Sequence, residues 1–160
     1  DEVPVDAARF LFNSYEANTR IDFDLDLAVQ QDSQNPVYYV QYAHARICSI
    51  LKNLAADGIQ PRACTAQELA LLTAPEELEL IRHLSSYTEE VQAAAKGMDP
   101  SKITRYVMNL STLFHKFYNA CRVKGSDEAL QAARLCLCTA TRTVLENGLA
   151  LFKVTAPESM

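Results

Sequence analysis

The sequence predicts an all-α protein: a bundle of four longer helices and a short fifth, preceded by a short helical N-terminal segment. Three observations support this fold class. The 160 residues include only 4 Gly, 6 Pro and no Trp, whereas Ala and Leu, which favour helices, are abundant. A hydrophobic content of 49% is enough for a substantial core in one compact domain. Helix start and stop signals also recur at intervals that suit long helices.

The first 33 residues are expected to form two short helices. Apolar periodicity places them at about residues 5–12 and 25–31, with a polar turn over residues 13–24 between them. The chain begins Asp-Glu-Val-Pro, which is not the pattern of a signal peptide, and no apolar run approaches the ~20 residues needed to cross a bilayer. We therefore expect a soluble, cytoplasmic protein with no membrane partner.

The next two helices have clear start signals. Asn35-Pro36 suits the N-cap and the first helical position, and no helix breaker follows until Asp57-Gly58, which predicts a helix of about 20 residues. Thr65 and Glu68 have the spacing of a capping box. This spacing predicts a short helix that runs to Leu72.

Three further long helices complete the bundle. Pro75 opens a helix over about residues 75–97, because acidic side chains near its start suit the helix dipole and Gly97 can end it. Asp99-Pro100 repeats the pairing of N-cap and first helical position and starts a helix that runs to about Val123. Gly125-Ser126 then breaks the chain, and the last long helix is expected to end near Asn147-Gly148.

Charge is sorted along the chain, although the formal net charge is −5. Eight acids lie within the first 32 residues and eight more from Asp57 to Asp99, but residues 33–56, 100–126 and 129–145 contain none. If these three segments are helices that pack side by side, they form a locally positive face that can guide a phosphate-bearing ligand. The alternative is accidental variation on the solvent side of the helices.

The sequence contains no recognisable catalytic or metal-binding motif. The cysteines have neither the paired spacing of a zinc site nor the even count of a disulfide framework, so reduced and largely buried thiols are expected at Cys48, Cys64, Cys121, Cys136 and Cys138. A Gly-rich phosphate loop, a His-Glu-x-x-His motif and a Ser/His/Asp arrangement are all missing. We predict no catalytic residue, no metal and no cofactor for this chain, which favours binding over chemistry.

The helix that begins at Pro36 carries two strips of side chains. At about 100° per residue, its core stripe comprises Val40, Ala43, Ile47, Ile50, Leu51 and Leu54. Tyr39, Tyr42, Arg46 and Asn53 fall on a neighbouring strip, at the boundary between bundle and water. Tyrosine rings there can stack on unpaired bases and the guanidinium can hold phosphate. The alternative is that the tyrosines are boundary packing residues with hydrated hydroxyls.

The helix that begins at Pro100 repeats this arrangement. Its core stripe comprises Ile103, Tyr106, Val107, Leu110, Phe114, Phe117 and Cys121, and beside it run Ser111, His115, Tyr118 and Arg122. His115 has no carboxylate within a helical turn, so we expect a surface or hydrogen-bonded histidine rather than an acid or base. His44, on the other helix, is expected to satisfy a hydrogen bond between helices.

Three stretches in the expected order resemble the C-terminal anticodon-binding domain of arginyl-tRNA synthetases. They are residues 35–46 (Asn-Pro-Val-Tyr-Tyr-Val-Gln-Tyr-Ala-His-Ala-Arg), residues 114–123, and residues 147–152 with the ending Ala-Pro-Glu-Ser-Met at 156–160. Residues 5–10 and 22–27 are similar to the segment that follows the catalytic domain of that family. The resemblance spans nearly the whole chain and is weakest over residues 58–96.

The resemblance implies a five-helix anticodon-binding bundle over residues 34–160, with residues 1–33 as the tail of a catalytic domain or a connecting segment that exposes Phe10, Phe12 and Phe23. It implies that arginine tRNA is the partner, that DNA is not, and that the missing catalytic domain of the same chain is a second partner. The residues at matching base-contact positions are Tyr39, Tyr42, Arg46, Tyr118, Arg122 and Met160. Met160 enters from the resemblance alone.

The resemblance also limits what this chain is expected to do. The Asp-Ala-Leu-Arg signature of the domain superfamily reads Asp-Glu-Ala-Leu-Gln at residues 127–131, and the His-Ile-Gly-His and Lys-Met-Ser-Lys type signatures for ATP are missing. The expected activity of the full-length parent is therefore the ATP- and magnesium-dependent ligation of arginine to its tRNA, whereas this chain alone is expected to be inactive. The alternatives are a helical protein-interaction domain that does not bind nucleic acid, and a synthetase for another amino acid.

Overall fold

The computed structural model describes residues 3–125 and 127–160, and these form eight helices and no strand. Asp1, Glu2 and Ser126 lie outside the described residues. Ser126 belongs to the predicted break at Gly125-Ser126. The helices are α1 (Val5–Phe12), α2 (Leu25–Val29), α3 (Pro36–Ala56), α4 (Ala66–Leu69), α5 (Pro75–Ser85), α6 (Tyr87–Gly97), α7 (Ser101–Ala120) and α8 (Glu128–Ala150). The all-α prediction is confirmed.

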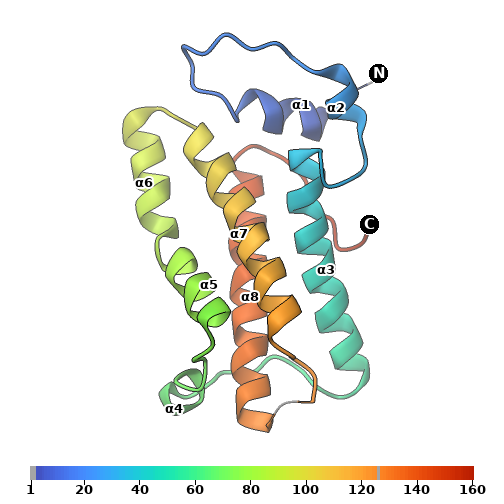
Figure 1. Cartoon of the computed structure of the whole chain (residues 1–160), viewed down its shortest axis with the longest axis vertical. Helices are drawn as coiled ribbons and strands as arrows, with labels where there is room; N and C mark the ends of the chain where they lie inside the picture. Colours follow the sequence, from blue (N-terminus) through green and yellow to red (C-terminus); the bar gives the residue numbers. More distant parts are fainter. Residues whose placement is uncertain (1–2, 126) are drawn as a thin grey trace.

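Three long helices, α3, α7 and α8, pack against one another and form the centre of the molecule (Figure 1). The α5 and α6 helices cover the other side of α7, and α1 with α2 lies across the upper ends of the long helices (Figure 1). The C-terminal tail descends from the upper end of α8 beside α3 (Figure 1). The three acid-free segments are therefore neighbours, which is the condition for them to share a positively charged face.

Short-range sequence signals explain where most of these helices begin. The Asn35 side chain accepts a hydrogen bond from the backbone N–H of Val37, and Pro36 follows it at the start of α3. Thr65 and Glu68 form the predicted capping box. Asp127 caps α8 by accepting from Ala129. Because each cap joins groups two or three residues apart, the sequence alone is enough to predict it.

The predicted helix over residues 75–97 is wrong in one respect, because it is interrupted at Ser86. The carbonyl of His83 accepts hydrogen bonds from the backbone N–H and the hydroxyl of Ser86, and from the hydroxyl of Tyr106 on α7 at 2.6 Å. These donors take the place of the regular helical bond from Tyr87, so the chain bends there and continues as α6. One of the three donors at this break therefore comes from α7.

The last helix ends close to the predicted position, at Ala150, but the prediction that Gly148 is its stop signal is wrong. Gly148 is buried inside the helix, and a Cβ added there would lie 2.4 Å from Cγ1 of Val107 on α7. This glycine permits two helices to approach closely rather than ending one of them. The α2, α4 and α7 helices are shorter than predicted by two or three residues at their C-terminal ends.

Both predicted core stripes are buried, which confirms the helical periodicity. The expectation that Phe10 is exposed is wrong: its side chain is fully buried, with its ring centroid 6.3 Å from that of Phe152. Phe12 is exposed and stacks on the partly buried Phe23. All five cysteines are free thiols, of which Cys121 and Cys138 are buried.

Candidate nucleic-acid interface

Side chains from α3 and α7 meet in one aromatic cluster on the surface. The Tyr39 hydroxyl lies 3.2 Å from the Thr112 hydroxyl, and the His115 ring centroid lies 5.4 Å from that of Tyr39 and 6.0 Å from that of Tyr42. The Arg46 guanidinium carbon lies 4.9 Å from the centre of the Tyr118 ring. We call Tyr39, Tyr42, Arg46, His115 and Tyr118 the aromatic cluster. The two strips that the helical periodicity predicts therefore face each other.

The rings of the aromatic cluster are held in place by a core residue and by the Arg46 side chain. Phe114 is fully buried, and the Tyr118 ring stacks on it with a centroid separation of 6.0 Å. Arg46 donates a hydrogen bond of 3.1 Å to the Tyr42 hydroxyl while its guanidinium covers Tyr118. Because the rings and the guanidinium are already positioned, a ligand would lose less conformational entropy on binding to them.

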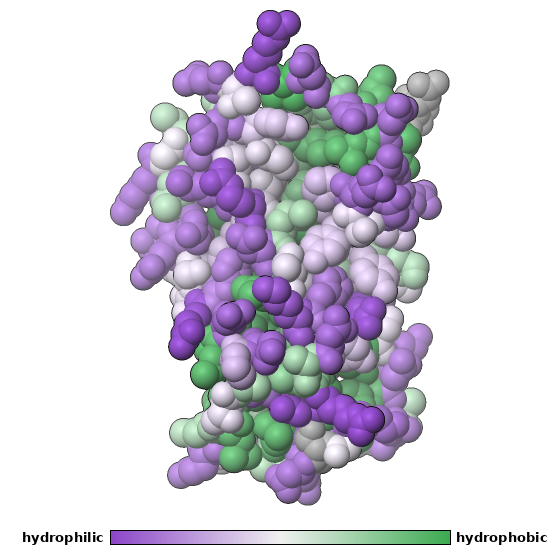
Figure 2. Space-filling view, in the orientation of Figure 1, coloured by the Kyte–Doolittle hydropathy of each residue, from purple (hydrophilic) through white to green (hydrophobic). Residues whose placement is uncertain are grey.

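The aromatic cluster remains open to solvent. Tyr42 is 38% exposed, and Tyr39, Arg46, His115 and Tyr118 are half-buried. Pale and strongly hydrophilic residues alternate on the face that overlies α3 and α7 (Figure 2). An aromatic surface of this kind can stack on an unpaired base, because every base has a π face.

Two of the predicted site residues lie outside the aromatic cluster. Arg122 follows the end of α7 and lines a pocket together with Tyr118, so it adjoins the cluster. Met160 is exposed and lies in a hollow formed by α1, α2 and the start of α3, where Tyr38 and Gln41 are among its neighbours. The structure thus brings together Tyr39, Tyr42, Arg46 and Tyr118, places Arg122 next to them, and does not join Met160 to them.

The C-terminal tail explains the placement of Met160. Gln41 donates a hydrogen bond of 2.9 Å to the Thr155 carbonyl, and Nδ1 of His44 lies 2.8 Å from the Pro157 carbonyl. The predicted helix-to-helix partner for His44 is therefore wrong, because this histidine holds the tail instead. The tail runs along a side of α3 away from Tyr39, which cannot be derived from the periodicity of α3 alone.

On α7, the helical periodicity placed one residue on the wrong side of the helix and did not identify two others as part of the candidate interface. Ser111 was expected beside the core stripe, but it is fully buried and donates to the Val107 carbonyl, so it has no place on the surface. Thr112, one residue later, occupies the surface position instead. His115, expected as a surface or hydrogen-bonded histidine, lies in the middle of the aromatic cluster. Its position on the same strip as Tyr118 was the available signal.

The protonation of His115 should oppose folding. Burial lowers the pKa of His115, and the nearby Arg46 charge lowers it further. Since the unfolded histidine keeps a pKa near the usual ~6.5, the unfolded state binds more protons than the folded state below that pH. The free energy of unfolding is therefore expected to fall as the pH decreases from about 7 through 6.5 toward the lower folded-state pKa.

Urea denaturation of the chain and of a His115→Gln variant at pH 7.5, 6.5 and 5.5 measures this contribution. The variant should lose less stability over that range than the original chain. Parallel losses in the two proteins would show that His115 is not responsible for the pH dependence.

The described parts of the chain give little support for other kinds of site. No group of three or more His, Cys, Asp or Glu side chains in residues 3–125 and 127–160 is arranged to hold a metal ion. Within the same ranges, no helix combines the length and the apolarity needed to cross a membrane. The aromatic cluster, with cations beside it, is therefore the main candidate for a functional surface.

Comparisons with known proteins identify the family of this domain. The sequence model of the DALR anticodon binding domain family matches residues 40–160. The chain is 52% identical to an arginine–tRNA ligase of Ruminiclostridium cellulolyticum and 49% identical to one of Acetivibrio thermocellus, in each case over 100% of this chain and 28% of the relative.

Solved structures give the same result for the fold. A putative arginyl-tRNA synthetase from Campylobacter jejuni superposes with a TM-score of 0.83 at 28% identity, over 100% of this chain and 34% of that chain. Thermus thermophilus arginyl-tRNA synthetase superposes with a TM-score of 0.82 at 30% identity, over 97% and 26% of the two chains. The chain spans less than a third of the length of the two arginine–tRNA ligases named above.

Proposed function

Because this chain belongs to the family of DALR anticodon-binding domains, we propose that it recognises the anticodon loop of arginine tRNA as the C-terminal part of an arginine–tRNA ligase. The observation that carries the proposal is the aromatic cluster, which combines three tyrosine rings with a guanidinium on an open surface. The names of the curated relatives supply the amino acid and the class of reaction.

In this proposal the two helices bind a single-stranded loop by stacking. Unpaired bases lie against Tyr39, Tyr42 and Tyr118, while Arg46 and Arg122 hold phosphate groups or base edges. Met160, in its hollow beside Tyr38, would contact a base only at the far edge of this surface. The loop bases are read while the acceptor end of the tRNA is bound elsewhere.

The chemical step belongs to the part of the protein that precedes this chain in its relatives. That part would bind ATP with magnesium and activate arginine, and this chain would supply tRNA affinity and selectivity. We propose the cytoplasm as the location, because translation takes place there. This chain alone is expected to be inactive as a ligase.

Replacing Tyr42 or Arg46 with alanine in the full-length parent is expected to weaken binding of arginine tRNA by about 1 to 3 kcal/mol for each change. Filter binding at several salt concentrations measures this, because phosphate contacts impose a negative dependence of affinity on salt. Activation of arginine without tRNA should change less than tRNA binding.

A matched control is Tyr15→Ala, which removes an exposed tyrosine remote in sequence from α3 and α7. If Tyr42→Ala and Arg46→Ala leave tRNA affinity unchanged, the aromatic cluster is not an RNA surface, and a helical protein-interaction domain becomes the better assignment. Comparison of arginine tRNA with other tRNA species tests the amino acid separately.

A further inference from the structure

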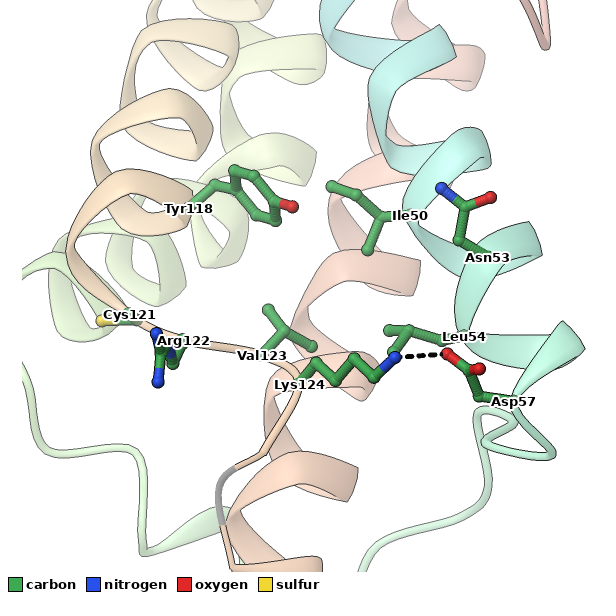
Figure 3. A pocket seen from close by; sticks show the side chains of 9 residues that line it. All are labelled: Ile50, Asn53, Leu54, Asp57, Tyr118, Cys121, Arg122, Val123 and Lys124. Atoms are coloured by element: carbon green, nitrogen blue, oxygen red, sulfur yellow. Dashed lines mark hydrogen bonds and ion pairs between the residues drawn. The ribbon is translucent and has the colours of Figure 1, made fainter.

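A pocket of about 490 Å³ lies next to the aromatic cluster, between the C-terminal halves of α3 and α7 (Figure 3). We call it the lower pocket. It is lined by Ile50, Asn53, Leu54, Asp57, Tyr118, Cys121, Arg122, Val123 and Lys124. Its volume falls in the range of pockets that hold small molecules, about 300–1,000 Å³.

Tyr118 joins the lower pocket to the aromatic cluster. Its ring lies beneath the Arg46 guanidinium and also points across the pocket toward Ile50 (Figure 3). From Tyr39 to Asp57 the residues facing this side of α3 extend over about 27 Å at 1.5 Å per residue. The aromatic cluster and the lower pocket therefore adjoin each other at Tyr118.

The walls of the lower pocket suit the flat and polar parts of a nucleotide. Ile50, Leu54 and Val123 provide apolar surface, and the edge of the Tyr118 ring, whose faces lie against Phe114 and Arg46, adds aromatic surface. Asn53 is exposed at the rim, and its amide can both donate to and accept from the edge of a base.

The charges at the rim suit a phosphate. Nζ of Lys124 lies 2.6 Å from a carboxylate oxygen of Asp57, in a pair whose side chains are 64% and 48% exposed (Figure 3). Exposed pairs of this kind contribute little to stability, so the ammonium can turn to a phosphate at small cost. Arg122 is a second cationic side chain that lines the pocket.

We propose that the lower pocket binds one unstacked nucleotide of the RNA strand that lies on the aromatic cluster. Its base packs between Tyr118 and the apolar wall, the Asn53 amide contacts the polar edge of the base, and Lys124 contacts its phosphate. This inference rests on the proposed function, and it adds Asn53 and Lys124 to the RNA-binding residues.

The test uses the full-length protein and the anticodon stem-loop of arginine tRNA. Asn53→Ala is expected to weaken binding at least about fivefold, the lower end of the effect of losing one base contact. Lys124→Gln is expected to weaken binding and to make its salt dependence less steep by about one phosphate contact. Lys116→Gln makes the same charge change on α7 beside Glu76 and Glu79, outside the pocket, and should have little effect.

Stem-loops that lack one base at a time identify the nucleotide. Removal of one particular base should weaken binding to the original protein more than binding to the Asn53→Ala variant, because the variant has already lost the amide contact to that base. If no position shows this coupling, the pocket does not hold a base.

The two proposals can fail separately. If Tyr42→Ala weakens binding but Asn53→Ala and Lys124→Gln do not, the lower pocket is not a nucleotide site and the proposed function stands. If none of these variants weakens binding, both proposals are wrong. Since Asn53 and Lys124 are exposed, their replacement should leave the melting temperature nearly unchanged, which circular dichroism checks.

Discussion

Replacing Glu77 with alanine is expected to destabilise the bundle by about 3–5 kcal/mol, the range for removing one partner of a buried ion pair. The Glu77 side chain is 1% exposed, and its carboxylate accepts a hydrogen bond of 2.7 Å from Nε of Arg134, whose side chain is 13% exposed. The same carboxylate accepts from the backbone N–H of Ala74 at the start of α5. Loss of Glu77 therefore removes a carboxylate from contact with a largely buried guanidinium and uncaps a helix.

The ion pair also has a link to the candidate interface. Arg134 donates a second hydrogen bond, of 2.6 Å, to the backbone carbonyl of Arg122. This contact holds the segment after α7 that forms one side of the lower pocket. Destabilisation by Glu77→Ala should therefore be accompanied by weaker RNA binding under conditions where the protein remains folded.

Urea denaturation of variants with one or both partners replaced measures the contribution of the pair. A Glu77→Leu/Arg134→Met variant should be more stable than Glu77→Ala, because no unpaired charge remains in the interior. Arg62→Gln, which breaks an ion pair on the surface, provides the control and should change stability far less. An equal loss in Glu77→Ala and Arg62→Gln would show that burial does not strengthen the effect.

Local signals were sufficient to predict most of the helices and the two strips of side chains that supply the aromatic cluster. The N-caps and the core stripes depend on residues within one or two helical turns, so they can be derived from the sequence. The strips that carry Tyr42 and Tyr118 follow from the same periodicity. Helical periodicity predicts the direction in which a side chain points from its own helix. It does not predict which other helix that side chain contacts.

The features that were not predicted all involve contacts distant in sequence. The break at Ser86 includes a donor from α7, the hydroxyl of Tyr106, and the tail is held by His44 across more than a hundred residues. The role of Gly148 was ambiguous in the sequence, because glycine is common both at helix ends and where two helices approach closely. The position of Val107 against Gly148 shows that the second role applies. The pocket beside Tyr118 could not be predicted either, because it needs the register of α3 against α7.

The boundary between residues 1–33 and 34–160 remains a prediction, and Phe10 offers a test of how firmly the first segment is attached. Phe10→Ala is expected to destabilise the protein by about 3–5 kcal/mol, the usual loss for a phenylalanine removed from a core. Phe10 is completely buried beside Phe152, and Ala7 and Leu11 on the same helix are buried with it. Thermal and urea denaturation should show the loss in a single cooperative transition that includes the bundle.

Phe12, two residues along the same helix, provides a matched control. Its side chain is 55% exposed and stacks on Phe23 rather than entering the core. Apolar colour gathers on the surface over α1 and α2 (Figure 2). Phe12→Ala should therefore change the stability of this chain little. If Phe10→Ala instead loosens α1 and leaves the melting of α3, α7 and α8 unchanged, the first segment folds apart from the bundle.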